Sequence, residues 1–310
     1  MYELLIVGGG PGGVAAGVYA ARKKIRVALI ADSFGGQSFV SADVQNWIGM
    51  KSVSGFDLAK ALEEHLRAQT DIDIIDDDLV AEVEDAGDFF RIKTKQGKTL
   101  EAKYLLLASG SRRKKLGVSG EKEFDGKGVV YCSTCDAPIF AGKKVAVVGG
   151  GNAGLEAVRD LIPYAAHIFL LARGDALRGD AITQEKISKN EKVTILLRAQ
   201  TTEIFGSGFV SGLRYTDLAS GAAKELPIEG VFVEIGAIPN CDFVKHLVNT
   251  NPMGEVVIDH KTQHTSHPRI WAAGDVSDVL YKQNNISAGD AVKAILHIYE
   301  TMHKGATNNS

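Results

Sequence analysis

Cysteine is scarce in this chain, and long basic or long apolar runs are missing. Three cysteines in 310 residues cannot build the disulfide framework of a small secreted domain. The formal net charge is -3, and no basic stretch of the kind that binds nucleic acid is present. No apolar run approaches the roughly 20 residues that cross a bilayer, and the chain opens in an apolar strand rather than a basic leader. We therefore expect a cytoplasmic protein with neither a nucleic-acid nor a membrane partner.

Glycine, in contrast, is abundant: the chain has 34 glycines, and many of them gather in two copies of one pattern. "LLIVGGGPGGVAAGVYAARKKIRVALIAD" and "VAVVGGGNAGLEAVRDLIPYAAHIFLLAR" each have the order strand, glycine turn, helix and strand. The G-x-G-x-x-G spacing falls on Gly8, Gly10 and Gly13 in the first copy and on Gly149, Gly151 and Gly154 in the second. The pattern predicts an α/β fold with two Rossmann-like dinucleotide-binding domains.

Each glycine of the pattern has its own physical task. The first allows a tight turn, the second lets a pyrophosphate approach the backbone, and the third lets helix and strand pack closely. The residues that open each helix, which include Pro11, Gly12, Asn152 and Ala153, offer free backbone N–H groups to a phosphate. A glycine pattern can also be a plain turn, but its strand–turn–helix setting and its repetition favour two nucleotide sites.

The two sites need not bind the same nucleotide. Asp32 follows the second strand of the first copy and is either the acceptor for a ribose hydroxyl or a surface turn residue. The corresponding strand of the second copy ends at Ala172 without an acid, and Arg173 and Arg178 follow. Arginines at this point suit a 2′-phosphate, so the second site favours NADPH, with NADH possible. Two solvated loop arginines are the alternative.

The C-terminal part of the chain is expected to return to the first domain. The apolar run 270–273 ends at Gly274 and Asp275, and a segment with helical spacing begins at residue 286. Beside the first glycine turn, these residues would cover the first nucleotide site.

Two short crossings would make the second domain an insertion into the first. The apolar strands "YLLLASG" and "GVFVEIGAIPN" each contain a glycine, Gly110 and Gly236, which we expect near a bound cofactor. The prediction is one domain made of 1–113 and 240–310, with the second domain, 114–239, inserted into it.

Two of the three cysteines, Cys132 and Cys135, lie in "YCSTCDAPIF", directly before Asp136. A C-x-x-C can be half a zinc site, a redox dithiol or a structural clip. A closed zinc site needs about four ligands, and only Cys241 is left among the thiols, so we expect no metal. If residues 132–136 begin a helix, its N-terminus favours a thiolate.

Together, these stretches resemble the low-molecular-weight thioredoxin reductases and the related C-terminal part of the alkyl hydroperoxide reductase flavoprotein. The matching segments run from end to end and are "GGGPGG", "FGGQ", "VQNWIG", "YCSTCDAPIF", "GGGNAG", "IGAIPN", "AAGD" and "YKQ". In that family the first site holds FAD, the second holds NADPH or NADH, and the C-x-x-C lies in the second domain. The resemblance implies a homodimer that reduces thioredoxin or a similar small redox protein.

The resemblance also implies roles for individual residues. Cys135 faces the flavin, Cys132 attacks the disulfide of the protein substrate, and Asp136 is the acid or base that serves the thiolate. The family's flavin contacts carry over to Gly8, Gly10, Pro11, Gly12, Gly13, Gly36, Gln37, Asn46, Gly274, Asp275, Lys282 and Gln283.

Several positions depart from the family pattern. "ARGDALR" has Gly174 where a further arginine is usual, and "YKQNNI" has two unusual amides. "SAGDAV" has Asp290 and Ala291 where the family has a second glycine, which is expected to alter the turn near the flavin. The basic run 112–115 is expected to be a solvated linker face rather than a docking surface.

These departures keep two other hypotheses open. One is a flavin dithiol oxidase or a ferredoxin-fed disulfide reductase that uses no nicotinamide. The other is a flavin-binding redox sensor that does not turn over.

Overall fold

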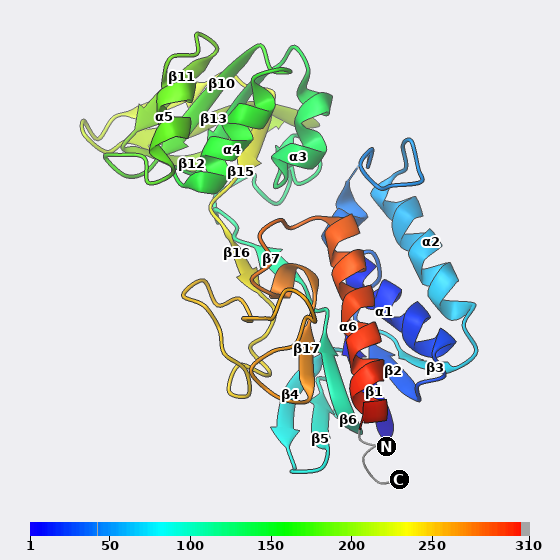
Figure 1. Cartoon of the computed structure of the whole chain (residues 1–310). Helices are drawn as coiled ribbons and strands as arrows, with labels where there is room; N and C mark the ends of the chain where they lie inside the picture. Colours follow the sequence, from blue (N-terminus) through cyan, green and yellow to red (C-terminus); the bar gives the residue numbers. More distant parts are fainter. Residues whose placement is uncertain (42, 305–310) are drawn as a thin grey trace. The chain divides into compact units, whose positions relative to one another are not determined.

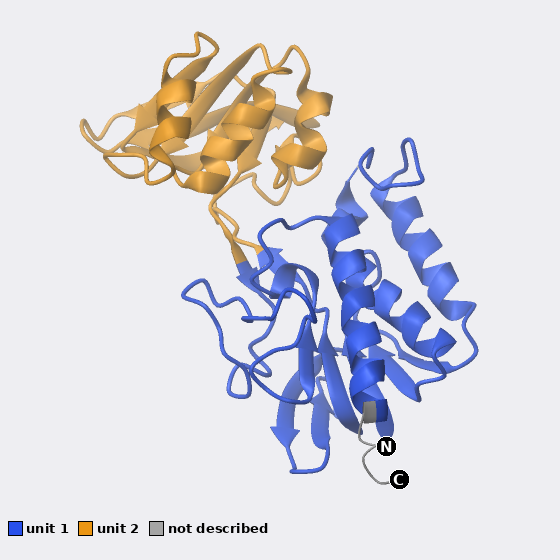
Figure 2. Cartoon of the chain, viewed as in Figure 1, with its two compact units in different colours: residues 1–112, 238–310 blue, residues 113–237 orange. Residues whose placement is uncertain are grey.

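The computed structural model describes residues 1–41 and 43–304, and its chain divides into two compact units. Unit 1 consists of 1–112 and 238–310, and unit 2 consists of 113–237 (Figures 1 and 2). The chain order therefore places unit 2 as an insertion into unit 1. The last six residues of the expected first domain lie outside the described residues.

Unit 1 is built on a seven-stranded sheet with the order β3-β2-β1-β6-β5-β4, in which β17 also pairs with β6. The pairs among β1, β2, β3, β6 and β17 are parallel, whereas β4 and β5 form an antiparallel extension. The elements are β1 (Tyr2–Val7), α1 (Pro11–Arg22), β2 (Val27–Ile30), η1 (Gly36–Val40), α2 (Gly55–Arg67), β3 (Ile72–Ile75), β4 (Val80–Asp85), β5 (Phe90–Thr94), β6 (Thr99–Leu107), β17 (Ile270–Ala272), η3 (Gly274–Val276) and α6 (Asn284–Lys304).

Strand β1 shows why this sheet has a core on both faces. Its side chains alternate between the faces, and all four of its last residues are buried because both faces are covered. Leu4 and Ile6 join the core under α1 and α6, whereas Leu5 and Val7 join the core on the opposite face. Figure 1 shows α1 and α6 lying next to each other along the sheet.

Unit 2 repeats the plan with a parallel five-stranded sheet of order β11-β10-β9-β15-β8 and adds an antiparallel sheet, β12-β13-β14. The strand–turn–helix–strand order in both units confirms the predicted Rossmann-like folds. The elements are β8 (Val129–Val130), α3 (Ser133–Asp136), η2 (Ala137–Phe140), β9 (Lys144–Val148), α4 (Asn152–Leu161), β10 (His167–Ala172), α5 (Ala181–Ser188), β11 (Val193–Leu197), β12 (Ala199–Ser207), β13 (Phe209–Asp217), β14 (Ala223–Leu226) and β15 (Gly230–Val233).

The two crossings, β7 (Ser111–Arg113) and β16 (Ala237–Pro239), pair as a two-stranded sheet. In the basic run at this point, Arg112 forms an ion pair with Asp242 at 3.6 Å. Its last member, Lys115, pairs with Asp125 and lies over the Tyr131 ring. None of the helices in the described part of the chain is long and apolar enough to cross a membrane.

Candidate active site

The two glycine turns have the same geometry. Gly8 and Gly149 each directly follow a β-strand and have a positive φ, 119° and 145°, a region that residues with a Cβ rarely adopt. A Cβ on Gly13 would collide with the carbonyl oxygen of Gly8, and a Cβ on Gly154 would collide in the same way with Gly149. The third glycine of each pattern is thus required for close packing of helix against strand.

The middle glycine of each turn faces open space instead. A Cβ on Gly151 would meet no atom within 4 Å, and one on Gly10 would meet only the Cα of Gly36 at 3.8 Å. Gly10 and Gly151 are the N-caps of α1 and α4, and neither helix has a side-chain cap. The first N–H groups of both helices therefore remain available to a phosphate, which is what a dinucleotide requires.

Residues assigned to the flavin by resemblance come together around the first turn. The Gln37 side-chain amide donates to Asp275 at 3.1 Å and to Ser111 at 3.3 Å. The Asn46 amide donates to the side-chain oxygen of Gln283 at 3.3 Å. The fold thus brings together polar side chains from segments more than 200 residues apart in the chain.

The lysine and the two unusual amides of "YKQNNI" have structural partners. Lys282 forms an ion pair with Glu255 at 3.0 Å and donates to the Asp275 carbonyl at 3.4 Å. Asn284 donates to the Ser38 hydroxyl, and Asn285 donates to the Asn46 carbonyl, both at 2.7 Å. The two amides therefore fasten the start of α6 to Ser38 of η1 and to Asn46, a role that sequence reasoning missed.

Other predicted residues of unit 1 follow the carboxyl ends of β2 and β6. Asp32 is exposed after β2, and Gly36 and Gly110 have positive φ values of 62° and 64°. Gly12 and Gly274 both lie against Ser287 of α6, a contact that the sequence did not reveal.

The expectation that Asp290 and Ala291 alter a turn near the flavin is wrong. Helix α6 already begins at Asn284, so both residues lie inside it. Asp290 is buried, accepts from the Gln263 amide at 3.3 Å and pairs with Lys293 at 2.8 Å. Ala291 is fully buried in the core under α6.

Unit 2 contains a pocket of about 920 Å³ at the carboxyl ends of β9, β10 and β15. Rossmann-like sheets bind their ligands at this edge. The predicted residues that line the pocket are Gly149, Gly151, Asn152, Ala153, Arg173, Arg178 and Gly236.

The two arginines of this unit 2 pocket are exposed, and among the described residues neither forms an ion pair. The backbone N–H of Arg178 donates to the Gly150 carbonyl at 2.7 Å, which fixes the loop against the glycine turn. Asp175 does not line the pocket. The geometry therefore leaves two free cations facing a nucleotide-sized space.

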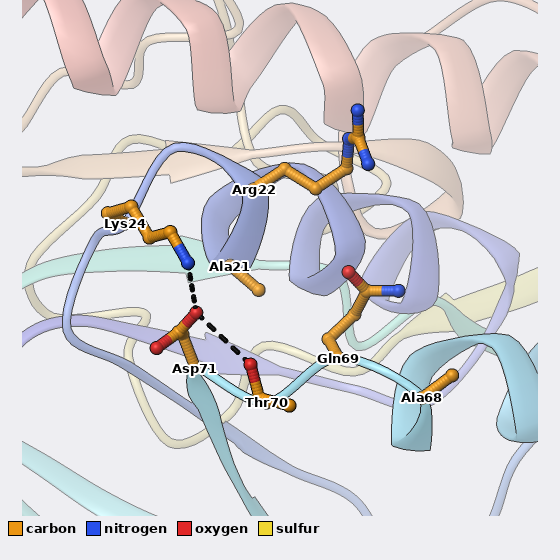
Figure 3. Close-up of a pocket in the computed structure, with 7 residues that line it drawn as sticks. All are labelled: Ala21, Arg22, Lys24, Ala68, Gln69, Thr70 and Asp71. Carbon is orange, nitrogen blue, oxygen red and sulfur yellow. Dashed lines mark hydrogen bonds and ion pairs between the residues drawn. The ribbon is translucent and has the colours of Figure 1, made fainter.

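A second pocket, of about 290 Å³, lies in unit 1 and contains none of the predicted residues. Figure 3 shows its walls at the ends of α1 and α2, where Lys24 reaches toward Asp71. Its one acid, Asp71, already forms an ion pair with Lys24.

Cys132 and Cys135 form a disulfide, and both are partly exposed. The helix expected to begin here is a single turn, α3, followed by the 3-10 turn η2. It stops because Pro138 has no N–H with which to continue an α-helix. The Ser133 and Thr134 hydroxyls both donate to Asp160 of α4, at 3.0 and 3.3 Å, and anchor the turn.

Residues 132–136, which carry the disulfide, are called the redox turn below. Two carboxyls at or near this turn are buried. Burial raises the pKa of Asp136, which is 8 % exposed, to about 6. Burial also raises the pKa of Glu234, which directly follows β15, to about 7. Sequence reasoning missed Glu234, although an acid at the end of the apolar run "GVFVE" was a signal. The third cysteine, Cys241, is fully buried in unit 1, where its thiol contacts the Gly254 carbonyl.

Two dinucleotide turns, a nucleotide-sized pocket and a disulfide in the same unit as that pocket define a class of oxidoreductase. The chain belongs to the pyridine nucleotide-disulphide oxidoreductase family, whose model matches residues 2–295. This family uses FAD and NAD(P)H.

Individual relatives agree with this assignment. The chain is 42 % identical over 304 residues to an alkyl hydroperoxide reductase component of Pseudomonas putida, a match that covers 96 % of this chain. It is 40 % identical over 299 residues, again 96 % of this chain, to an NADH dehydrogenase of Bacillus subtilis. In both cases the chain spans only 58 % of the relative's length.

Among solved structures, a thioredoxin reductase from Streptococcus pyogenes matches with a TM-score of 0.90 and 32 % identity. That match covers 98 % of this chain and 99 % of the other. The architecture of the whole described chain is therefore that of a thioredoxin reductase-like protein.

Proposed function

We propose that this protein is a cytoplasmic, homodimeric disulfide reductase. It passes electrons from NADPH through FAD and the Cys132–Cys135 dithiol to thioredoxin or a similar small redox protein. The observation that carries the proposal is the disulfide on a one-turn helix beside the buried Asp136, in the unit that also holds the 920 Å³ pocket.

In this proposal FAD belongs to unit 1. The open position at Gly10 and the uncapped start of α1 fit a pyrophosphate, and the cluster of Gln37, Asn46, Asp275 and Gln283 supplies polar partners. When bound, FAD supplies a two-electron carrier between a nicotinamide and a disulfide.

The redox turn then carries out the thiol–disulfide exchange and the proton transfer. Opening the disulfide takes up two electrons and two protons, and yields two thiols. Cys132 attacks the disulfide of the partner as a thiolate, and Cys135 closes the internal disulfide again. Asp136, with its pKa near 6, can both hold and release a proton close to neutral pH.

NADPH is the proposed coenzyme, bound in the unit 2 pocket. Arg173 and Arg178 line that pocket without ion-pair partners among the described residues, so both can meet a 2′-phosphate with charge-assisted hydrogen bonds. Position 174 is a glycine rather than a third arginine. We therefore expect only a modest preference for NADPH over NADH.

The similarity to alkyl hydroperoxide reductase components supports a second candidate with the same internal chemistry. There the electron acceptor would be a separate thioredoxin-like protein that serves the reduction of alkyl hydroperoxides. The chain spans 58 % of these relatives, so the activity of the whole relative is not implied by the match.

An anaerobic titration followed by a coupled assay tests the proposal. NADPH should bleach the flavin absorbance stoichiometrically, and thioredoxin should then be reduced. Bleaching by dithionite or dithiols but by neither nucleotide would favour the oxidase or ferredoxin-fed alternative. Bleaching without turnover on any disulfide partner would favour the sensor.

A further inference from the structure

Glu234 occupies a position that none of the roles above uses. Only 8 % of the residue is exposed, and its backbone N–H donates to the Val148 carbonyl at 2.9 Å. Strands β15 and β8 pair in parallel, with Phe232 opposite Val130. Glu234 directly follows β15, and Cys132 lies two residues beyond the end of the neighbouring strand β8.

The contacts of Glu234 reach both the redox turn and the nucleotide turn. Its carboxyl accepts a hydrogen bond from the backbone N–H of Ser133, the neighbour of Cys132 and the first residue of α3. Its carbonyl oxygen is the atom with which a Cβ on Gly149 would collide, and Glu234 also lines the unit 2 pocket.

Groups from several elements set the charge of this carboxyl. Burial has the largest influence and raises the pKa of Glu234 to about 7. Asp160 and Glu156 of α4 also raise the pKa, whereas Arg113 of β7 and the Ser133 N–H lower it. The carboxyl therefore gains its negative charge close to neutral pH.

We propose that Glu234 is a positioning residue that controls the ionisation of the Cys132 thiol once the disulfide is open. This rests on the proposed role of the cysteine pair as a redox dithiol. An ionised Glu234 holds the Ser133 N–H and puts a negative charge beside Cys132, which disfavours the thiolate. A protonated Glu234 removes that charge. Since the thiolate is the nucleophile, Glu234 limits the attack of Cys132 on a partner disulfide at alkaline pH.

A purely structural role makes a different prediction. If the carboxyl only anchors α3, any substitution that keeps the hydrogen bond leaves the thiol unchanged. Glutamine keeps a side-chain oxygen that can accept the Ser133 N–H but carries no charge at any pH. Glu234→Gln therefore separates the effect of charge from that of the hydrogen bond.

The test is the rate of Cys132 alkylation by iodoacetamide between pH 5.5 and 8.5. It uses the full-length, FAD-loaded protein with Cys135→Ser, so that no internal disulfide forms. Cys241 is fully buried and adds little background. Glu229→Gln, an exposed carboxyl at the other end of β15, is the matched control.

We expect Glu234→Gln and its parent to react alike at pH 5.5, where Glu234 is protonated. At pH 8 the variant should react about 3-fold faster, the effect of lowering the pKa of an ordinary thiol from about 8.5 to about 7.5. The Glu229→Gln control should follow the parent throughout. A ratio that is the same at every pH, including a ratio of one, would overturn the proposal.

The parent protein with the added substitution Asp136→Asn provides a second test, should the Glu234 variant fold poorly, because it removes the other buried carboxyl of this turn. Its alkylation rate should rise less than tenfold per pH unit around pH 7, because the growing charge on Glu234 opposes thiol ionisation. A curve that fits the titration of one independent thiol would contradict the proposal. Neither test involves a nucleotide or a protein partner, so a negative result leaves the reductase proposal itself intact.

Discussion

The backbone N–H of Asp136 donates to the carbonyl oxygen of Cys132 at 3.0 Å and closes the turn that also contains Cys135. A buried carboxyl and both sulfur atoms thus share one short stretch of backbone. The glycine turns and the unit 2 pocket lie on other elements, so changes in this turn should separate thiol chemistry from cofactor binding.

Replacing either cysteine should abolish disulfide reduction and leave FAD bound. Cys132→Ser removes the proposed attacking thiol, and Cys135→Ser removes the thiol that closes the internal disulfide. The predicted FAD contacts come from unit 1, so the flavin content and its reduction by NADPH should persist. The measurement is thioredoxin turnover beside flavin stoichiometry, and near-normal turnover by either variant would refute the dithiol mechanism.

Asp136→Asn should slow the opening of the disulfide by about 10²–10⁴, the usual range for loss of a general acid–base group. Burial raises the pKa of this carboxyl to about 6, so the wild-type rate should show an inflection near pH 6 that the variant lacks. Rapid-mixing kinetics across pH 5–8 measure both effects. Asp217→Asn, on β13, is the control, and equal rates in wild type and Asp136→Asn would leave Asp136 a structural residue.

In the second glycine turn, alanine should have different effects at Gly151 and at Gly154. At Gly151 a Cβ meets no protein atom within 4 Å, so Gly151→Ala should keep the wild-type Tm. Its methyl group would occupy the approach of the pyrophosphate and should weaken NADP⁺ binding by about 10-fold or more. At Gly154 a Cβ collides with the Gly149 carbonyl, so Gly154→Ala should lower the Tm.

Calorimetry and NADP⁺ titration distinguish these two outcomes. Unchanged NADP⁺ affinity in Gly151→Ala would show that the nucleotide does not approach this turn.

The coenzyme preference should depend on Arg173. Because Arg173 and Arg178 both line the pocket, we expect kcat/KM to favour NADPH over NADH by about 10-fold. Arg173→Ala should narrow that gap because it removes one charge-assisted contact with the 2′-phosphate. Asp175→Asn, which changes a residue outside the pocket lining, should leave the ratio unaltered. Equal or better kcat/KM with NADH in the wild type would show this interpretation of "ARGDALR" to be wrong.

Local sequence was sufficient to predict the two glycine turns. The residues that such a turn requires lie within about a dozen positions of one another. They are Gly8 and Gly13 in the first copy, and Gly149 and Gly154 in the second. The sequence also predicts an inserted second domain, because "YLLLASG" and "GVFVEIGAIPN" are expected to connect the two domains.

Long-range contacts could not be predicted in this way. Glu234 and the redox turn follow the neighbouring strands β15 and β8, which lie about 100 residues apart in the chain. The anchoring of Asn285 on the Asn46 carbonyl spans 239 residues. Asp290 was misjudged because α6 already begins at Asn284, which places the residue inside the helix and next to Gln263 rather than in a turn.

The most direct test of the proposed function is one anaerobic experiment with the FAD-loaded, full-length protein. NADPH is added in stoichiometric steps while the flavin absorbance is followed, and oxidised thioredoxin is then supplied. We expect NADPH to bleach the flavin and thioredoxin to restore its colour, with thiols appearing on thioredoxin in equal measure. A flavin that neither NADPH nor NADH can bleach, while dithionite does, would contradict the proposed function.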